Sequence, residues 1–177
     1  MSDREPLRAF QRRLADRLQA APDTRVKAAW LAVEAGGGRY LLPLAQAGEI
    51  FPAQHLHPVP YTQSWLLGVA SLRGNLHVVA DLAGLVTRNR DGLLPSCAPG
   101  SDAQWVTLNP LLDVQCALRI DRLVGLRSAE AFAGTAPAPG QPPAWFGDTW
   151  LDTHGLSWQS LDLQALSREP GFLRIGI

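Results

Sequence analysis

The chain has 177 residues, of which 46% are hydrophobic and 18% charged, a composition typical of a globular protein. Lys+Arg and Asp+Glu number 16 each, so the zero net charge gives no electrostatic support for nucleic acid or an anionic membrane as the main partner. No window approaches the ~18 apolar residues of a membrane span, and the charged N-terminus lacks the apolar core of a signal peptide. We therefore expect a cytoplasmic protein of one domain or two small subdomains, with no direct membrane insertion.

The first predicted element is a helix over residues 5–20. Pro6 suits a first helical position, and Leu7, Phe10, Leu14 and Leu18 repeat along one face. Residues 1–24 are thus expected to form a helical extension. Its apolar face could pack on its own domain or dock on a partner.

Several strand candidates follow the extension. Val26–Ala35 and Arg39–Leu44 flank three glycines, which favours a hairpin, whereas a phosphate-binding loop would need a Lys-Ser/Thr ending and a following helix. Gly48–Phe51 continues the pattern. The prolines at 58 and 60 keep residues 55–60 extended and edge-like.

The central stretch of the chain is Trp65–Leu82. Two mostly apolar runs flank a Gly74-Asn75 pair, which predicts two antiparallel strands joined by a tight turn. Arg73, one residue before that turn, is a lone cation in an apolar run. A short helix over Asp81–Val86 is expected next.

The second half of the chain is also rich in predicted strands. A helix capped by Asp162 and a closing strand end it. In order, we expect strands at Gln104–Asn109, Val114–Ile120 and Leu123–Leu126, a Pro/Gly-rich loop over 133–144, a hairpin of Trp145–Asp152 and Leu156–Leu161, a helix at Leu163–Ser167 and a strand over 172–177.

Few residues suggest metal or redox chemistry. Cys97 and Cys116 are too few for a disulfide framework and too far apart in sequence for a metal-binding pair. His55 and His57 would share one side of an extended segment, as metal ligands do, but no further ligand stands nearby in sequence. We expect no metal and no cofactor.

Catalytic signals are equally sparse. Asp152, His154 and Ser157 include the residue types of a hydrolase triad, but they lie within one short turn, where such residues usually bond their own backbone. No paired carboxylates or activated nucleophile emerge, which favours a binding module over an enzyme. One alternative is a β-module that binds carbohydrate or peptide through its six Trp residues, although their aliphatic neighbours favour core positions. A hydrolase centred on the 152–157 turn is another.

Glu49 and Arg73 are single charges in otherwise apolar or small runs. A partly buried ion left alone would cost roughly several kcal/mol, so an ion pair between the two is the natural expectation. The alternative is two unrelated exposed side chains at strand ends.

Five pieces over residues 26–86 carry a recognisable pattern, in the order Val26–Ala35, Gly48–Ile50, Pro58–Pro60, Trp65–Gly74 and Val78–Leu82. In order and spacing they resemble the CheW-like chemotaxis coupling proteins. The second half fits more loosely. The N-terminal helix, Trp65 and Gly171–Leu173 are more similar to the PilI-type branch, which serves the chemosensory systems of type IV pili and twitching motility.

The resemblance implies a mainly β fold, with two five-stranded SH3-like barrels sharing a hydrophobic seam. The CheW-like domain would span residues 25–177, with subdomains at about 25–87 and 103–170 and a C-terminal segment returning to the first. It also implies a non-enzymatic adaptor, recruited to membrane receptor arrays. Its partners would be a methyl-accepting chemoreceptor and the regulatory domain of a CheA-type histidine kinase.

The resemblance also implies a partner-binding site. Glu49 and Arg73 would be paired charges beside the receptor groove, and Asp81 would close the strand after the turn. The residues that would shape the groove are Gly68, Val69, Leu72 and Gly74. Ser71 departs from the family pattern, where Asn is usual, and His77 and Ala80 replace larger aliphatic residues.

Overall fold

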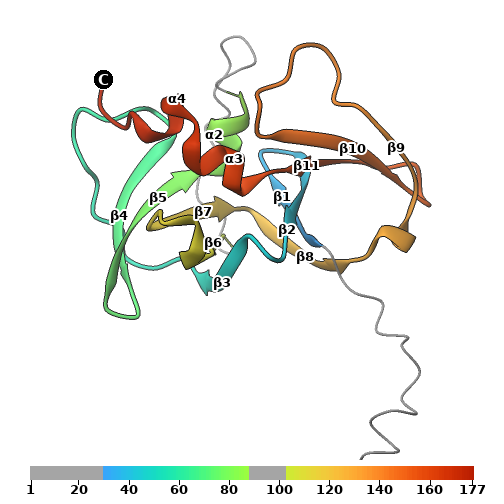
Figure 1. The fold of residues 1–177 in the computed structure, drawn as a ribbon. Coiled ribbons are helices and arrows are strands. Elements are labelled where there is room, and N and C mark those ends of the chain that lie inside the picture. Colours follow the sequence, from blue (N-terminus) through green and yellow to red (C-terminus); the bar gives the residue numbers. More distant parts are fainter. Residues whose placement is uncertain (1–29, 88–102) are drawn as a thin grey trace, which may run out of the picture.

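The computed structural model describes residues 30–87 and 103–177. They form two β-sheets with short helices, so the predicted mainly β class is confirmed (Figure 1). The predicted helix over 5–20 and the 1–24 extension lie outside the described residues.

The larger sheet has six strands in the order β8-β1-β2-β11-β10-β9. Gly36 and Gly37 have φ of 56° and 75°, and they make the predicted hairpin turn between β1 and β2. β2 and β11 pair in parallel, while the other neighbours are antiparallel. The strands are β1 (Trp30–Ala35), β2 (Gly38–Pro43), β8 (Arg122–Arg127), β9 (Phe132–Ala136), β10 (Phe146–Asp152) and β11 (Ser157–Leu161).

The second sheet has five strands in the order β3-β6-β7-β5-β4. β4 and β5 form the predicted central hairpin, and β5 pairs in parallel with β7. The strands are β3 (Ala47–Pro52), β4 (Leu66–Leu72), β5 (Asn75–Asp81), β6 (Gln104–Leu108) and β7 (Cys116–Ile120).

All the helices of the described residues are short. Asp162 caps α3 by accepting hydrogen bonds from the backbone N–H groups of Gln164 (2.9 Å) and Ala165 (3.0 Å), as predicted. The closing strand predicted over 172–177 is wrong, because Pro170 starts a further helical turn and only Gly176 makes a single bridge, to Thr62. The helices are α2 (Leu82–Thr87), η1 (Pro110–Leu112), η2 (Ala129–Ala131), α3 (Leu163–Arg168) and α4 (Pro170–Leu173).

Two more local predictions differ from the structure. Leu123–Leu126 does not continue the β6–β7 pair, since β8 leaves that sheet and pairs with β1. The loop predicted over 133–144 begins later, because residues up to Ala136 form strand β9. Both differences depend on pairing between distant segments, which local residue patterns do not specify.

The sheets do not coincide with the predicted subdomains, because β1 and β2 join strands from the second half of the chain. Within residues 30–87 and 103–177, no strand ladder joins the two edge strands of either sheet, so closed five-stranded barrels are not observed. The division at about 25–87 and 103–170 therefore stays a prediction about folding units.

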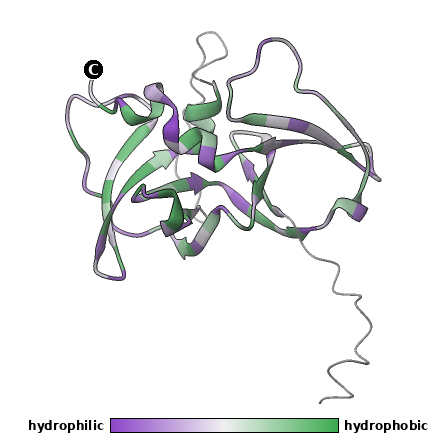
Figure 2. Cartoon of the chain, viewed as in Figure 1, coloured by the Kyte–Doolittle hydropathy of each residue, from purple (hydrophilic) through white to green (hydrophobic). Residues whose placement is uncertain are grey.

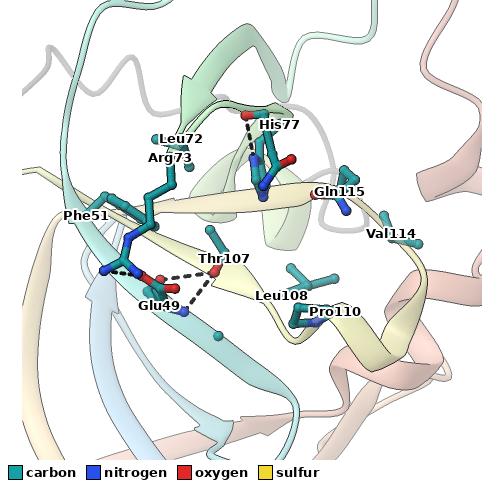
Figure 3. Close-up of a pocket in the computed structure, with 12 residues that line it drawn as sticks. Glu49, Phe51, Leu72, Arg73, His77, Thr107, Leu108, Pro110, Val114 and Gln115 are labelled. Atoms are coloured by element: carbon teal, nitrogen blue, oxygen red, sulfur yellow. Dashed lines mark hydrogen bonds and ion pairs between the residues drawn. The ribbon is translucent and has the colours of Figure 1, made fainter.

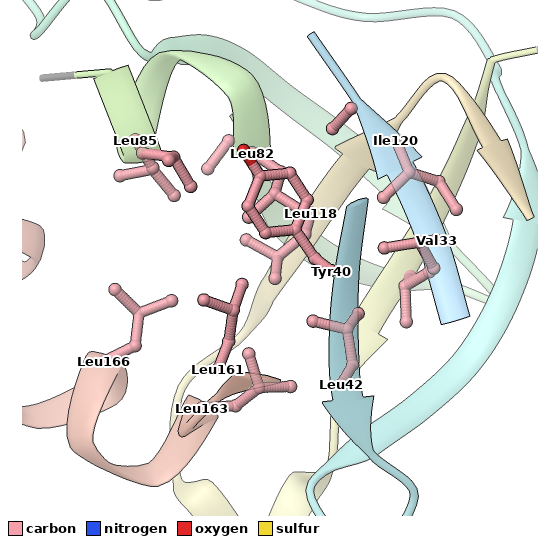
Figure 4. Packing of buried hydrophobic residues seen from close by; sticks show 14 of the residues in the cluster. Val33, Tyr40, Leu42, Leu82, Leu85, Leu118, Ile120, Leu161, Leu163 and Leu166 are labelled. Atoms are coloured by element: carbon pink, nitrogen blue, oxygen red, sulfur yellow. The ribbon is translucent and has the colours of Figure 1, made fainter. Parts of the chain in front are cut away.

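One hydrophobic core lies between the sheets (Figure 4). Val33 and Leu42 enter it from the six-stranded sheet, and Leu118 and Ile120 from the five-stranded sheet. Helices α2 and α3 add leucines to it, and α2 is largely hydrophobic along its length (Figure 2). This shared core packs the two sheets against each other, and it includes Leu66 and Ala80 near the ends of β4 and β5.

Candidate functional site

The turn between β4 and β5 holds the site's arginine in an unusual conformation. Leu72 pairs with Asn75, so Arg73 and Gly74 are the two turn residues, one position earlier than predicted. Their φ values of 50° and 83° are typical of a type I′ turn. A left-handed conformation costs a residue with a Cβ about 1 to 2 kcal/mol, so an arginine at position 73 does not stabilise the turn.

Arg73 and Glu49 form an ion pair, which confirms the predicted pairing. Arg73 Nη2 lies 2.8 Å from Glu49 Oε2, and its guanidinium carbon lies 5.9 Å from the centre of the Phe51 ring (Figure 3). The side chains are 72% and 52% exposed. Because water screens such a pair, it contributes little to stability, and both groups are accessible to a partner.

Thr107 on β6 holds the backbone of Glu49. The β3–β6 register shifts between Ala47 and Ile50, which places Glu49 in an irregular part of the strand. The buried Thr107 hydroxyl accepts a hydrogen bond from Glu49 N (2.8 Å) and lies 3.2 Å from Glu49 O, to which it can donate. Such irregularities re-aim side chains, and here the carboxylate points toward Arg73.

A groove of about 300 Å³ extends from this ion pair. Its wall is partly apolar, with Phe51, Leu72 and Leu108 among its lining residues. The lining residues are Gly48, Glu49, Phe51, Leu72, Arg73, Asn75, His77, Thr107, Leu108, Pro110, Val114 and Gln115.

Gly68 and Val69 are not among the lining residues of the groove. Gly68 has a φ of 148°, and a Cβ there would meet the backbone oxygen of His57. Val69 exchanges two backbone hydrogen bonds of 2.8 Å with His57. The two residues hold the 55–60 segment against β4, on the same hairpin whose other end carries Leu72, Arg73 and Gly74.

Asp81 closes β5 at the end remote from the turn. Its Oδ2 accepts a hydrogen bond from Gly84 N (3.1 Å), and its Oδ1 lies 3.2 Å from Arg119 Nη1. Arg119 is 8% exposed at its side chain and also contacts Asp121 at 3.5 Å. Asp81 therefore belongs to a buried ion network, and nothing places it at the groove.

Sequence reasoning missed Thr107 and Arg119. Arg119 carries the same signal as Arg73, a lone charge between Leu118 and Ile120 in an apolar strand. Thr107 offers no such signal, because Thr is common in strands and its partner, Glu49, is 58 residues away.

Asp152, His154 and Ser157 form a turn rather than an assembled triad. Asp152 Oδ1 accepts hydrogen bonds from the backbone N–H of His154 (2.8 Å) and Leu156 (2.9 Å), and Oδ2 accepts one from the Trp158 indole (3.0 Å). These hydrogen bonds lower the pKa of Asp152. The bond from Leu156 has the largest effect, and those from Trp158 and His154 add to it. This matches the expectation that the turn residues bond their own backbone.

The remaining chemical candidates are packed or incomplete. The His55 and His57 rings contact each other at 4.6 Å, and no group of three or more metal-type side chains occurs in the described part of the chain. Burial raises the pKa of the Cys116 thiol to about 12, as for a packed thiol, while Cys97 lies outside the described residues. No helix within 30–87 or 103–177 has the length and apolar character needed to cross a membrane.

The tryptophans of the described residues pack within the protein. Trp65, Trp105, Trp145 and Trp158 are 1–3% exposed. Trp30 and Trp150 contact each other and Phe132 at ring-centre distances of 4.6 to 6.0 Å. Because these rings pack against one another, the arrangement does not favour stacking of a sugar on their faces.

Comparison with known proteins agrees with the resemblance in the sequence. The CheW-like domain matches residues 29–170. The chain is 25% identical to Protein PilI of Pseudomonas aeruginosa, over 94% of this chain and 90% of that protein. Scaffolding protein TtCheW from Thermoanaerobacter tengcongensis has a similar fold, with a TM-score of 0.60 at 15% identity, covering 75% of this chain and 86% of that one. Because the family match spans most of the residues, from before β1 to the start of α4, this chain belongs to the CheW-like domain family.

Proposed function

We propose that this protein is a non-enzymatic adaptor that couples the cytoplasmic tip of a methyl-accepting chemoreceptor to the regulatory domain of a CheA-type histidine kinase. Membership of the CheW-like family supports a scaffolding role. Similarity to Protein PilI along nearly the whole chain supports a place in chemotaxis or twitching-motility signalling. The protein would act in the cytoplasm, recruited to membrane receptor arrays.

The observation that carries this proposal is the accessible Glu49–Arg73 pair beside a partly apolar groove. Arg73 occupies a left-handed turn position that disfavours it, and its pair with Glu49 is too exposed to offset much of that cost. Backbone strain without a stabilising return is typical of functional positions. We infer that Arg73 serves a partner rather than the fold.

A helical receptor tip suits this groove. Apolar side chains along one helix face would enter between Phe51 and Pro110, and polar side chains would meet the ion pair. Leu72 lines the groove at the end of β4, and Gly74 would shape it through the turn, between the lining residues Arg73 and Asn75. Gly68, Val69 and Asp81 would act indirectly, by fixing the strands that carry the turn. We also propose that each sheet curls into one of the SH3-like barrels that the family resemblance implies.

Charge reversal at the turn tests the proposal. Arg73→Glu should weaken co-purification with the receptor cytoplasmic fragment, the kinase regulatory domain or both, and leave the far-UV circular dichroism spectrum unchanged. Arg122→Glu is a matched control, because Arg122 is 65% exposed and pairs with Glu34 at 2.9 Å. Unchanged binding of both partners by Arg73→Glu would remove Arg73 from the interface.

Exchanging the two charges distinguishes a role in ion pairing within the protein from a role in partner recognition. Glu49→Arg with Arg73→Glu keeps an ion pair within the turn region but reverses its direction. If a partner reads the charges, binding stays weak in the double variant. If the pair only shapes the protein, the double variant recovers binding and the recognition role is lost.

A further inference from the structure

The N-terminal segment, residues 1–29, joins the described fold at a point near the groove. Trp30, the first residue of β1, pairs with Pro43 of β2, and Pro43 O accepts a hydrogen bond from Gln46 N at 2.9 Å in the turn that leads to β3. Paired strands are about 5 Å apart and a chain advances at most about 3.6 Å per residue. The Cα atom of Trp30 therefore lies at most about 24 Å from that of Gly48, which lines the groove.

The turn between β2 and β3 is fixed to one wall of the groove. Asn109 N donates to Gln46 O at 2.8 Å, and Asn109 Nδ2 donates to Ala45 O at 2.9 Å. Asn109 stands in the chain between Leu108 and Pro110, which both line the groove. These bonds hold the first hairpin, where the N-terminal segment joins, in a set position relative to the groove.

The connection between the helix predicted over residues 5–20 and β1 is long enough to reach the groove. Residues 21–29 span up to about 30 Å when extended, which exceeds the distance of about 24 Å between the start of β1 and the groove. A helix over residues 5–20 would itself be about 24 Å long. The predicted helix can therefore lie along the groove of its own molecule.

The apolar face of the predicted helix matches the groove in size and character. The groove offers Phe51, Leu72 and Leu108 as apolar contacts (Figure 3). Its volume of about 300 Å³ suits one aromatic ring and a neighbouring aliphatic side chain, such as Phe10 and Leu14. The helical spacing places four apolar residues on one face, namely Leu7, Phe10, Leu14 and Leu18.

The charges of the N-terminal segment and of the rest of the chain are complementary. Residues 1–29 contain seven Arg and Lys and four Asp and Glu, a net charge of +3, and because the whole chain is neutral the remaining residues carry −3. Arg13 and Arg17 follow Phe10 by three and seven positions, so on a helix these side chains lie on one side. With the ring in the groove, the two cations would approach the exposed carboxylate of Glu49.

We propose that residues 5–20 occupy the groove of the same molecule, with Phe10 as the anchor and Arg17 next to Glu49. An amphipathic helix in a groove is also the mode of binding proposed for the receptor tip, and the following consequence rests on that proposed function. The receptor and the N-terminal segment compete for one site. A segment that fills the groove in nine molecules of ten weakens receptor binding about tenfold.

Substitutions within the N-terminal segment test the contact in the full chain, because they leave the sequence of residues 30–177 unchanged. The apolar-face variant combines Phe10→Asp with Leu14→Asp. The control variant combines Ala9→Asp with Gln19→Asp, which adds the same charge on the opposite face of the predicted helix.

The backbone amide resonances of the groove report the contact directly. In two-dimensional amide NMR spectra, the resonances of Glu49, Arg73 and Leu108 should shift in the apolar-face variant and stay in place in the control variant. In the unmodified protein their positions should not depend on concentration, because the contact lies within one molecule. Resonances that stay in place in the apolar-face variant, or that shift equally in the control, would exclude the contact. Positions that change with concentration would instead place the segment on a second copy and overturn the inference.

Receptor binding separates this inference from the proposed function. Isothermal titration calorimetry with the receptor cytoplasmic fragment should show binding about tenfold tighter in the apolar-face variant and unchanged in the control. If none of the three proteins binds the fragment, the proposed function fails, while shifted groove resonances still establish the contact. If all three bind equally and the resonances stay in place, the contact is excluded and the adaptor role stands. Shifted resonances without tighter binding would overturn the competition between segment and receptor.

Discussion

Thr107 and Glu49 are joined twice across the β3–β6 pair. The Thr107 hydroxyl lies 2.8 Å from Glu49 N and 3.2 Å from Glu49 O, so one buried side chain replaces the strand hydrogen bonds that the register shift interrupts. The exposed half of the ion pair thus depends on a buried residue of another strand. This division separates residues that hold the site from residues that a partner would meet.

Thr107→Val should destabilise the protein by about 1 to 3 kcal/mol, because the methyl group leaves the backbone groups of Glu49 without their partner. Thr107→Ser keeps the hydroxyl and should cost less. Urea denaturation gives the free energy of unfolding of both. A near-neutral Thr107→Val with a larger loss for Thr107→Ser would show that the hydroxyl contributes little and that packing of the methyl group matters instead.

Gly48→Ala should also destabilise the protein, by roughly 1 to 3 kcal/mol, since a Cβ there would lie 2.9 Å from Leu108 O and closer still to the Thr107 hydroxyl. Gly134→Ala is the matched control, because it also lies in a strand but has nothing within 4 Å of the added Cβ. Thermal unfolding compares them. A neutral Gly48→Ala would mean that β3 can move away from β6 without loss.

Arg73→Asn should stabilise the protein by up to ~1 kcal/mol, because Asn tolerates the left-handed turn better than Arg does. The same substitution should weaken partner binding, since the cation is lost. Arg122→Asn, in a regular strand, lacks the stabilising effect. A less stable Arg73→Asn protein would show that the contacts of Arg73 with Glu49 and Phe51 outweigh the strain of the turn.

Arg119→Met should cost about 3 to 5 kcal/mol, because it leaves the carboxylates of Asp81 and Asp121 without their buried counter-charge. Arg122→Met removes a 65% exposed cation from β8, the next strand along the chain, and should change stability by only about 0 to 1 kcal/mol. Guanidinium denaturation measures both. Similar values for the two variants would mean that the network is effectively solvated.

Asp152 should make the stability of the protein depend on pH. Hydrogen bonds, above all from Leu156 N, lower its pKa from an ordinary value of 3.8, so the folded state holds this proton less tightly than the unfolded state. Its contribution is therefore full above the ordinary pKa and is lost as pH falls through the lowered pKa. Asp152→Asn should reduce stability at pH 7, and the difference should shrink in acid. A difference that persists unchanged in acid would contradict this, and Asp148→Asn, an exposed carboxylate of the same strand, is the control.

The sequence by itself determined most of the local structure. The glycines at 36 and 37 placed the first hairpin, apolar runs placed β4 and β5, and Asp162 placed the start of α3. These predictions hold because turn geometry and capping depend on residues within a few positions of one another. The lone charges at 49 and 73 were enough to expect their pairing, and family resemblance suggested where it would lie.

Only the tertiary structure decided which strands share a sheet, and therefore what surrounds the site. Alternating apolar residues predict a strand but not its neighbour, so nothing local joins β2 to β11 or carries β8 away from β7. The turn lies one residue earlier than predicted, since the pairing of Leu72 with Asn75 places Arg73 inside it. Thr107 could not be found from sequence, because its role depends on a bulge that forms only when β3 meets β6, 58 residues away along the chain.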